Sequence, residues 1–170
     1  YNTGLGKLTT ALNWTYMIKY DYQRLRNGPW FTNLGQYNDG GVTFRNIGRV
    51  SATLKTGPLE NTLTANHKAG SLDQPCTPAA CSLVRTVNAN GSIGGVVSMT
   101  TFVVKSYSTI DWQGRYEFNK SLDVVMGVLN LLDRNPPLTL KTSGGHQLGY
   151  DNRYTDPRGR TLYVKLSLRF

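Results

Sequence analysis

The last stretch of the chain constrains the fold most, because its side chains alternate strictly between apolar and polar. From Gly159 to Phe170 the sequence reads G-R-T-L-Y-V-K-L-S-L-R-F. Alternation with a period of two residues predicts a β-strand with one apolar face and one polar face. A soluble sheet seldom ends on such an apolar edge, whereas a closed barrel in a lipid bilayer needs a strand of this kind to pair with its first strand. The apolar face of this predicted strand consists of Leu162, Val164, Leu166, Leu168 and Phe170.

The composition agrees with a chain whose strands are apolar on one side only. The 170 residues include 18 Gly and 10 Tyr, and 17% are charged. The hydrophobic content of 39% is below the globular norm of about 45–50%. The sequence has no apolar run of about 18 residues and therefore no transmembrane helix. A β-barrel is then the one way in which this chain could span a membrane.

Net charge and cysteines restrict the partners that we expect. The formal net charge is +9, but Lys and Arg are scattered singly and no RNA- or DNA-binding motif is present, so we expect no nucleic-acid partner. Cys76 and Cys81 lie in C-T-P-A-A-C, where a small disulfide loop in an oxidising compartment is one interpretation and two free thiols are the other. A zinc site would need two more ligands nearby, so we expect neither a metal nor a cofactor.

Alternation elsewhere predicts five further strands, all antiparallel to their neighbours. The first runs over 8–22 with Trp14, Tyr16, Tyr20 and Tyr22 on its apolar face, a cluster typical of the aromatic girdle at a membrane interface. The others form a hairpin around the turn 56–61 and a pair of strands, the first over about 101–118, joined at 119–121. The connections at 24–45, 69–97 and 133–158 are long and turn-rich. This alternation predicts a transmembrane barrel with short periplasmic turns, long extracellular loops and the cysteine pair outside.

Six strands cannot close a barrel of this kind, because such barrels begin at about eight strands. The chain is therefore expected to be one part of a larger barrel or one subunit of an assembled barrel. It begins at Tyr1 without Met and without a charged and apolar leader, which favours the first possibility. Residues 1–170 would then be the C-terminal segment of a barrel domain.

Candidate ligand contacts come from the first long loop, which carries Trp30, Phe31 and Tyr37. These rings either touch a ligand or pack the loop onto itself. His67 is on the apolar register near a strand end and is expected to be an interfacial residue rather than a ligand or base. An outer-membrane protease could use His146 with Asp151 and Asp156, but these carboxylates fit Asx turns better. We therefore expect no enzymatic activity.

Three segments resemble TonB-dependent outer-membrane receptors. V-M-G-V-L-N-L-L-D-R-N-P-P (Val125–Pro137) resembles a signature of that family, although Leu129 and Leu132 replace its common Asn and aromatic residue. The ending Tyr154–Phe170 looks like the closing strand, and L-N-W-T-Y-M-I-K-Y-D (Leu12–Asp21) is similar to a common barrel strand. The likeness covers essentially the whole chain and corresponds to the C-terminal part of such a receptor.

The resemblance implies a barrel of about 22 strands of which this chain supplies the last six. It implies an N-terminal plug domain outside this chain, contact with TonB through that plug, and residence in the bacterial outer membrane. Members import scarce nutrients such as iron chelates, cobalamin, peptides or oligosaccharides, driven by the inner-membrane proton gradient. The apolar register Leu162–Leu168 with Phe170 would be read by the barrel-assembly machinery. Residues facing the lumen and plug would be Lys7, Lys19, Arg49, Lys55, Arg115 and Glu117.

Two other classes share parts of the pattern. A passive porin or an autotransporter barrel would have the same lipid-facing residues and a terminal Phe, and the N-L-L-D-R-N-P-P motif favours the transporter. A secreted β-sandwich binding module would need shorter strands and a second sheet.

Overall fold

The computed structural model describes residues 2–73, 85–96, 102–139 and 149–169, which are all-β and contain no helix. Among these residues there is accordingly no helix of the length and apolarity that crossing a membrane requires. Six long strands form one antiparallel sheet in sequence order, with the two-residue β1 (Asn2–Thr3) at one edge. The long strands are β2 (Gly6–Tyr16), β7 (Asn46–Thr56), β8 (Leu59–Lys68), β13 (Tyr107–Asn119), β14 (Leu122–Leu129) and β15 (Thr161–Leu168).

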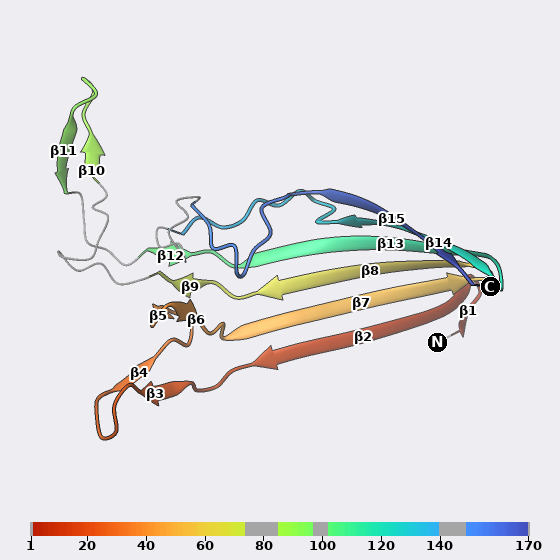
Figure 1. Cartoon of the computed structure of the whole chain (residues 1–170), viewed down its shortest axis with the longest axis horizontal. Helices are drawn as coiled ribbons and strands as arrows, with labels where there is room; N and C mark the ends of the chain where they lie inside the picture. Colours follow the sequence, from red (N-terminus) through yellow and green to blue (C-terminus); the bar gives the residue numbers. More distant parts are fainter. Residues whose placement is uncertain (1, 74–84, 97–101, 140–148, 170) are drawn as a thin grey trace.

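The connections differ in length at the two ends of the sheet, as the sequence predicts. Two-residue turns join β7 to β8 and β13 to β14, where Thr56 pairs with Leu59 and Asn119 with Leu122. The first turn is tighter than the predicted 56–61, because strand pairing continues until Gly57 and Pro58. Figure 1 shows these turns at one end with β1, and the three long connections at the other. We call the latter the long-loop end.

The long connections contain strands that the sequence did not predict. The first holds two hairpins, β3 (Asp21–Gln23) with β4 (Trp30–Thr32) and β5 (Tyr37–Asn38) with β6 (Gly41–Val42). The second holds β9 (Ser71–Leu72) paired with β12 (Val103–Val104), and β10 (Arg85–Val87) paired with β11 (Ile93–Val96). The predicted irregular loops are therefore partly ordered by local pairing.

Two predicted strand boundaries were wrong. The strand expected over 8–22 leaves the sheet after Tyr16, because residues 21–23 pair with 30–32 in their own hairpin instead of with β7. The alternation continues through this break, so the sequence pattern carries no mark of it. The strand expected over 101–118 similarly begins at Tyr107, since Val103 and Val104 pair with β9.

One face of the six-stranded sheet is apolar along every strand. In the register Leu12 is opposite Val50, Val50 opposite Ala65, and Ala65 opposite Ile110. The same face continues through Met126 and Val164 on the last hairpin. The described part of the chain contains no buried hydrophobic side chain, and its largest exposed ones include Leu162 at 75% and Leu12 at 71%. The apolar face therefore has no cover within this structure.

The opposite face is polar and contains side-chain hydrogen bonds. The Thr53 and Thr62 hydroxyls lie 2.9 Å apart across β7 and β8, and Arg115 on β13 donates to Asp123 on β14 at 3.3 Å. Buried residues of this face are hydrophilic, with Thr64 at 6% and Asp123 at 7% exposure. The sheet thus reverses the distribution of a soluble domain, in which apolar side chains are buried and polar ones exposed.

At two glycines, a large aromatic ring from the neighbouring strand packs directly over the glycine backbone. On the polar face Tyr163 of β15 covers Gly127 of β14, and a Cβ at Gly127 would be 2.2 Å from the ring. The Tyr163 hydroxyl continues across the sheet and donates to Gln113 at 2.9 Å. On the apolar face Trp14 covers Gly48 in the same way. Rings over glycine fix the register of paired strands, because only that pairing leaves room for them.

Gly127→Ala should displace Tyr163 and destabilise the β14–β15 hairpin by about 1–3 kcal/mol, the usual cost of overpacking. We expect a lower midpoint in urea unfolding. Gly4→Ala is the control, because nothing lies within 4 Å of that position. In a Tyr163→Ala background the Gly127→Ala substitution should cost much less. An equal cost in both backgrounds would contradict the proposed ring contact.

Candidate functional site

A cavity of about 810 Å³ lies on the polar face near the long-loop end. Strands β2, β7, β8 and β13 contribute its floor, and the segment Gly149–Gly159, which we call the strap, contributes residues on its other side. We call this space the polar cavity. The floor consists largely of amides, hydroxyls and charged groups, including Asn13, Thr15, Arg49, Asn66, Thr109 and Asp111.

Strand register brings these floor residues together. Asn13, Arg49, Asn66 and Thr109 are paired in turn across β2, β7, β8 and β13. They occupy alternate positions from the apolar residues Leu12, Val50 and Ile110, so the alternation that predicts the strands also places the polar groups on one face. Sequence reasoning identified Arg49 as lumen-facing but did not group it with the three neutral side chains.

The carboxylate of the floor accepts two hydrogen bonds, whereas the guanidinium of the floor receives no partner from the described residues. Asp111 accepts from the Asn66 amide at 2.8 Å and from the backbone N–H of Asn130 at 2.8 Å. Arg49 forms no hydrogen bond or ion pair with another described residue. The cavity therefore offers the Arg49 guanidinium as a donor beside neutral and charged polar groups, an arrangement suited to a hydrophilic ligand.

The N-L-L-D-R-N-P-P motif forms a tight turn at the edge of the polar cavity. Asn130 is 6% exposed and has a left-handed backbone with φ 51°. Its side chain accepts from the Arg134 N–H and donates to the Arg134 carbonyl, both at 2.9 Å. Asp133, with φ 52°, accepts from the Arg160 N–H at 2.8 Å. The motif therefore ties the end of β14 to the start of β15, because its Asn and Asp side chains tolerate this backbone and hydrogen-bond locally.

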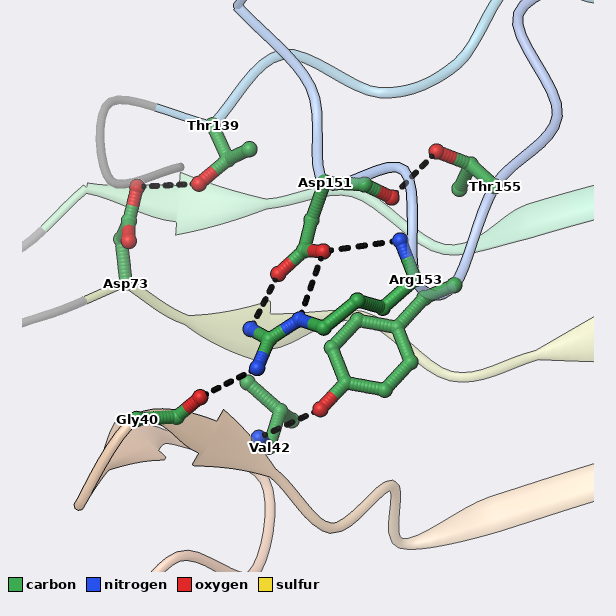
Figure 2. Close-up of polar contacts among 8 residues, drawn as sticks. Gly40, Val42, Asp73, Thr139, Asp151, Arg153 and Thr155 are labelled. Carbon is green, nitrogen blue, oxygen red and sulfur yellow. Dashed lines mark hydrogen bonds and ion pairs between the residues drawn. The ribbon is translucent and has the colours of Figure 1, made fainter. Parts of the chain in front are cut away.

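The strap contacts the first long loop through Arg153 and Tyr154. Figure 2 shows the Asp151 carboxylate holding the Arg153 guanidinium, which also donates to the Gly40 carbonyl. The hydrogen bond to Asp151 raises the pKa of Arg153, which remains charged. The Tyr154 hydroxyl accepts from the Val42 N–H at 3.1 Å, and the Tyr154 ring meets Phe44 edge-on at 5.0 Å. These contacts join the strap to the β5–β6 hairpin.

Two further contacts hold the same region. Lys68, the last residue of β8, donates to the Tyr154 carbonyl, so the strap is also tied to the sheet. Beside it, Thr139 donates to the Asp73 carboxylate at 2.8 Å, and Asp73 is 3% exposed (Figure 2). The packing of the loops therefore depends on hydrogen bonds rather than on an apolar core.

The strap contains two Asp-x-Arg sequences, Asp151–Arg153 and Asp156–Arg158. The second forms a purely local ion pair. Asp156 accepts from the Arg158 guanidinium at 2.6 Å and from the Arg158 N–H at 3.0 Å. The side-chain hydrogen bond from Arg158 lowers the pKa of Asp156 to about 2. Both Asp-x-Arg sequences therefore make the local contacts expected of Asx turns, and only the first reaches another loop.

The structure separates the three aromatic residues predicted to contact a ligand. Phe31 packs under the Arg24 guanidinium at 4.2 Å and beside Tyr22, which makes it a loop-packing residue. Tyr37 lies beside a small space between β5–β6 and β9–β12. Trp30 is 69% exposed. None of them lines the polar cavity, so ligand contact by these three residues stays a prediction.

Of the other residues singled out from the sequence, His67 and Asp156 are among those that line the polar cavity, whereas the apolar residues of β15 lie apart from it and others lie outside the described residues. Leu162, Val164, Leu166 and Leu168 lie on the apolar face of β15, with 57–75% exposure. Cys76, Cys81, His146 and Phe170 fall outside the residues that the structure describes. His67 stacks on Trp14 at a centroid distance of 5.6 Å and hydrogen-bonds the Ser108 hydroxyl at 2.8 Å, near the long-loop end of the apolar face.

No group of three or more His, Cys, Asp or Glu within the described ranges could hold a metal ion. Comparison with models of protein families, with curated protein sequences and with solved structures finds no match. The features of this chain that bear on its function are therefore the two faces of the sheet, the polar cavity and the strap.

Asn130→Ala should lower the unfolding midpoint, because it removes both hydrogen bonds to Arg134 and replaces asparagine, which tolerates a left-handed backbone, with alanine, which does not. The expected loss is about 2–4 kcal/mol. Asn130→Gly is the matched variant, since it loses the same hydrogen bonds without the backbone strain. Glycine should therefore be less damaging than alanine, and the reverse order would contradict the turn described here.

Arg158→Ala should raise the pKa of Asp156 from about 2 toward its ordinary value of 3.8. Because the pKa of Asp156 is depressed in the folded protein, the ion pair adds to the free energy of unfolding above pH 3.8, and this contribution is lost as the pH falls through 2. A carboxyl NMR titration of Asp156 measures the change. Arg153→Ala should leave that titration unaltered, and an ordinary pKa for Asp156 in the unsubstituted protein would contradict the pair.

Proposed function

We propose that this chain is the C-terminal segment of the β-barrel of an outer-membrane transporter that imports a scarce nutrient with energy delivered through TonB. The apolar face would meet lipid, the polar face would line the barrel interior, and the long connections would be extracellular. Partners would be the preceding barrel strands, a plug domain, TonB acting on that plug, the barrel-assembly machinery and outer-membrane lipid.

The observation that carries the proposal is the reversed polarity of the sheet. The described residues bury no hydrophobic side chain, while large apolar side chains on every long strand are exposed on one face. A continuous exposed apolar surface is costly in water and marks an interaction surface. In a bilayer the same surface is favourable, and the sheet then needs further strands to satisfy its edges.

The polar face supports transport rather than a purely structural role. It contains a cavity of about 810 Å³ whose floor has a free Arg49 guanidinium. A barrel that admits hydrophilic cargo needs polar groups of this kind on its inner wall. The N-L-L-D-R-N-P-P motif, through its resemblance to receptors energised by TonB, favours active import over a passive porin.

Intact mass and heat-modifiable gel migration of the protein isolated from outer membranes test the barrel assignment. A species several times the 18.9 kDa of this chain, migrating faster before heating than after it, is the expected result. A species of 18.9 kDa that stays soluble without detergent would contradict the assignment and favour a secreted β-sandwich.

Liposome swelling distinguishes active import from passive flow. Vesicles containing the purified protein should not swell in isotonic small sugars if a plug fills the barrel. Vesicles containing a known porin serve as the positive control. Swelling as fast as with the porin would overturn the transporter proposal in favour of a passive channel.

A further inference from the structure

Two positively charged side chains of the polar cavity lie diagonally across adjacent strands. Arg49 of β7 is paired with Asn66 of β8, and Lys68 lies two residues further along β8 on the same face. Side chains in this diagonal relation start about 7–8 Å apart, within the combined reach of an arginine and a lysine. Both line the cavity of about 810 Å³, where β7 and β8 lie side by side (Figure 1). A single ligand group can therefore contact both cations.

Neither cation is paired with a carboxylate of the described residues. Arg49 has no hydrogen-bond or ion-pair partner there, and the Lys68 ammonium donates only to the neutral Tyr154 carbonyl. An ammonium has three N–H donors, so Lys68 keeps two for another acceptor. Lys68 also borders the small space lined by Asp73 and Asp151, but within the described ranges it forms no ion pair with either carboxylate. Two neighbouring cations without a counter-charge repel each other, which favours an anion between them.

The other charges of the cavity lining do not cancel these two cations. Arg153 is held by the Asp151 carboxylate at 2.6 Å, and Asp156 accepts from the Arg158 guanidinium at 2.6 Å. Asp111 is the one lining carboxylate without a cationic partner among the described residues, and it accepts two N–H hydrogen bonds from neutral groups. The unpaired charges of the lining are thus two positive and one negative. A cleft with an excess of one sign concentrates ligands of the opposite sign.

Neutral groups beside Arg49 add a donor and keep the carboxylate away. Asn13 of β2 is opposite Arg49 on the side away from β8, lines the cavity, and has a side-chain amide without a partner in the described part of the chain. On β8 the Asn66 amide donates to Asp111 at 2.8 Å, which holds that carboxylate on the β13 side. An oxyanion at Arg49 therefore meets a charged donor with an amide beside it, the combination that binds carboxylates and phosphates most strongly.

We propose that the polar cavity binds an anionic group of the imported solute, a carboxylate or a phosphate, between Arg49 and Lys68. The planar guanidinium binds two oxygens of this group, the ammonium donates to it from the next strand, and Asn13 donates from the other side. We call this arrangement the anion site. Neutral solutes such as uncharged sugars lack the group that the two cations bind. The inference rests on the proposed function, since it takes the polar face to be the interior of a barrel that admits the solute.

Calorimetric titration of the complete outer-membrane protein in detergent at low salt tests the anion site. The probes are citrate, inorganic phosphate and sucrose, which are a polycarboxylate, a phosphate and a neutral polar solute. We expect saturable binding of citrate or phosphate that weakens with added NaCl, and no binding of sucrose. Tighter binding of citrate assigns a carboxylate to the solute, and tighter binding of phosphate assigns a phosphate group. No saturable binding of either anion, or equal binding of sucrose, would overturn the proposal.

Variants that remove one charge assign the binding to these residues. Arg49→Gln and Lys68→Gln should each weaken anion binding about tenfold, the effect of losing a hydrogen bond between charged groups. Arg49→Lys keeps the charge without the planar fork and should weaken it less. Lys165→Gln is the matched control, because Lys165 of β15 is exposed on the same polar face, has no partner among the described residues and does not line the cavity. Unchanged binding in Arg49→Gln, or an equal loss in Lys165→Gln, would contradict the anion site.

Heat-modifiable migration separates a failed anion site from a failed barrel. A protein that shows heat-modifiable migration but binds neither citrate nor phosphate contradicts the anion site alone. A protein that binds an anion through Arg49 but shows no heat-modifiable migration contradicts the proposed barrel and not the binding of an anion to this face. If Lys68→Gln does not assemble because the contact with the Tyr154 carbonyl is lost, Arg49→Gln decides, since Arg49 makes no such contact with a described residue.

Discussion

The need to cover the apolar face of the sheet is the constraint on which the rest of this structure depends. The six-stranded sheet presents Leu12, Leu63, Met126 and Leu162 to its surroundings, and the described residues supply nothing to cover them. Hydrophobic burial is the main force that stabilises folded proteins, so this face needs a cover from outside the described residues, and in the function that we propose that cover is lipid. Backbone pairing along the strands cannot replace it, because an isolated sheet gains little net stability from hydrogen bonds that water would also satisfy.

The polar face follows from the same constraint. A strand that is apolar on one side places its alternate residues on the other side. Here those residues form hydrogen-bonded rows and the cavity floor, including the Arg49 guanidinium, which is unpaired within the described residues. The loops are then tied to this face by polar contacts such as Lys68 with Tyr154 and Arg153 with Gly40. The function that we propose uses both faces, with lipid on one and solute on the other.

Alternation was enough to predict the antiparallel sheet, its faces and its unequal connections, because successive side chains of a strand point to opposite faces and the sequence shows which face is apolar. It failed where strands ended: Tyr16 is followed by further alternation, but local pairing of residues 21–23 with 30–32 prevails. The sequence alone could not predict two contacts. The Gly127–Tyr163 contact depends on the register of β14 and β15, and the Arg153–Gly40 contact depends on how two loops pack. The Asp-x-Arg sequences were recognised as turns, but nothing local distinguishes the one that crosses to another loop.

The most direct test of the central claim is spin-label accessibility along β2, from Leu8 to Tyr16, in the complete protein reconstituted into bilayers. Labels at even positions should collide with oxygen, which concentrates in lipid, and labels at odd positions with a water-soluble nickel chelate. The two profiles should therefore oscillate with a period of two residues and in opposite phase. Profiles that rise and fall together, or a nickel maximum at Leu12, would contradict a lipid-facing sheet.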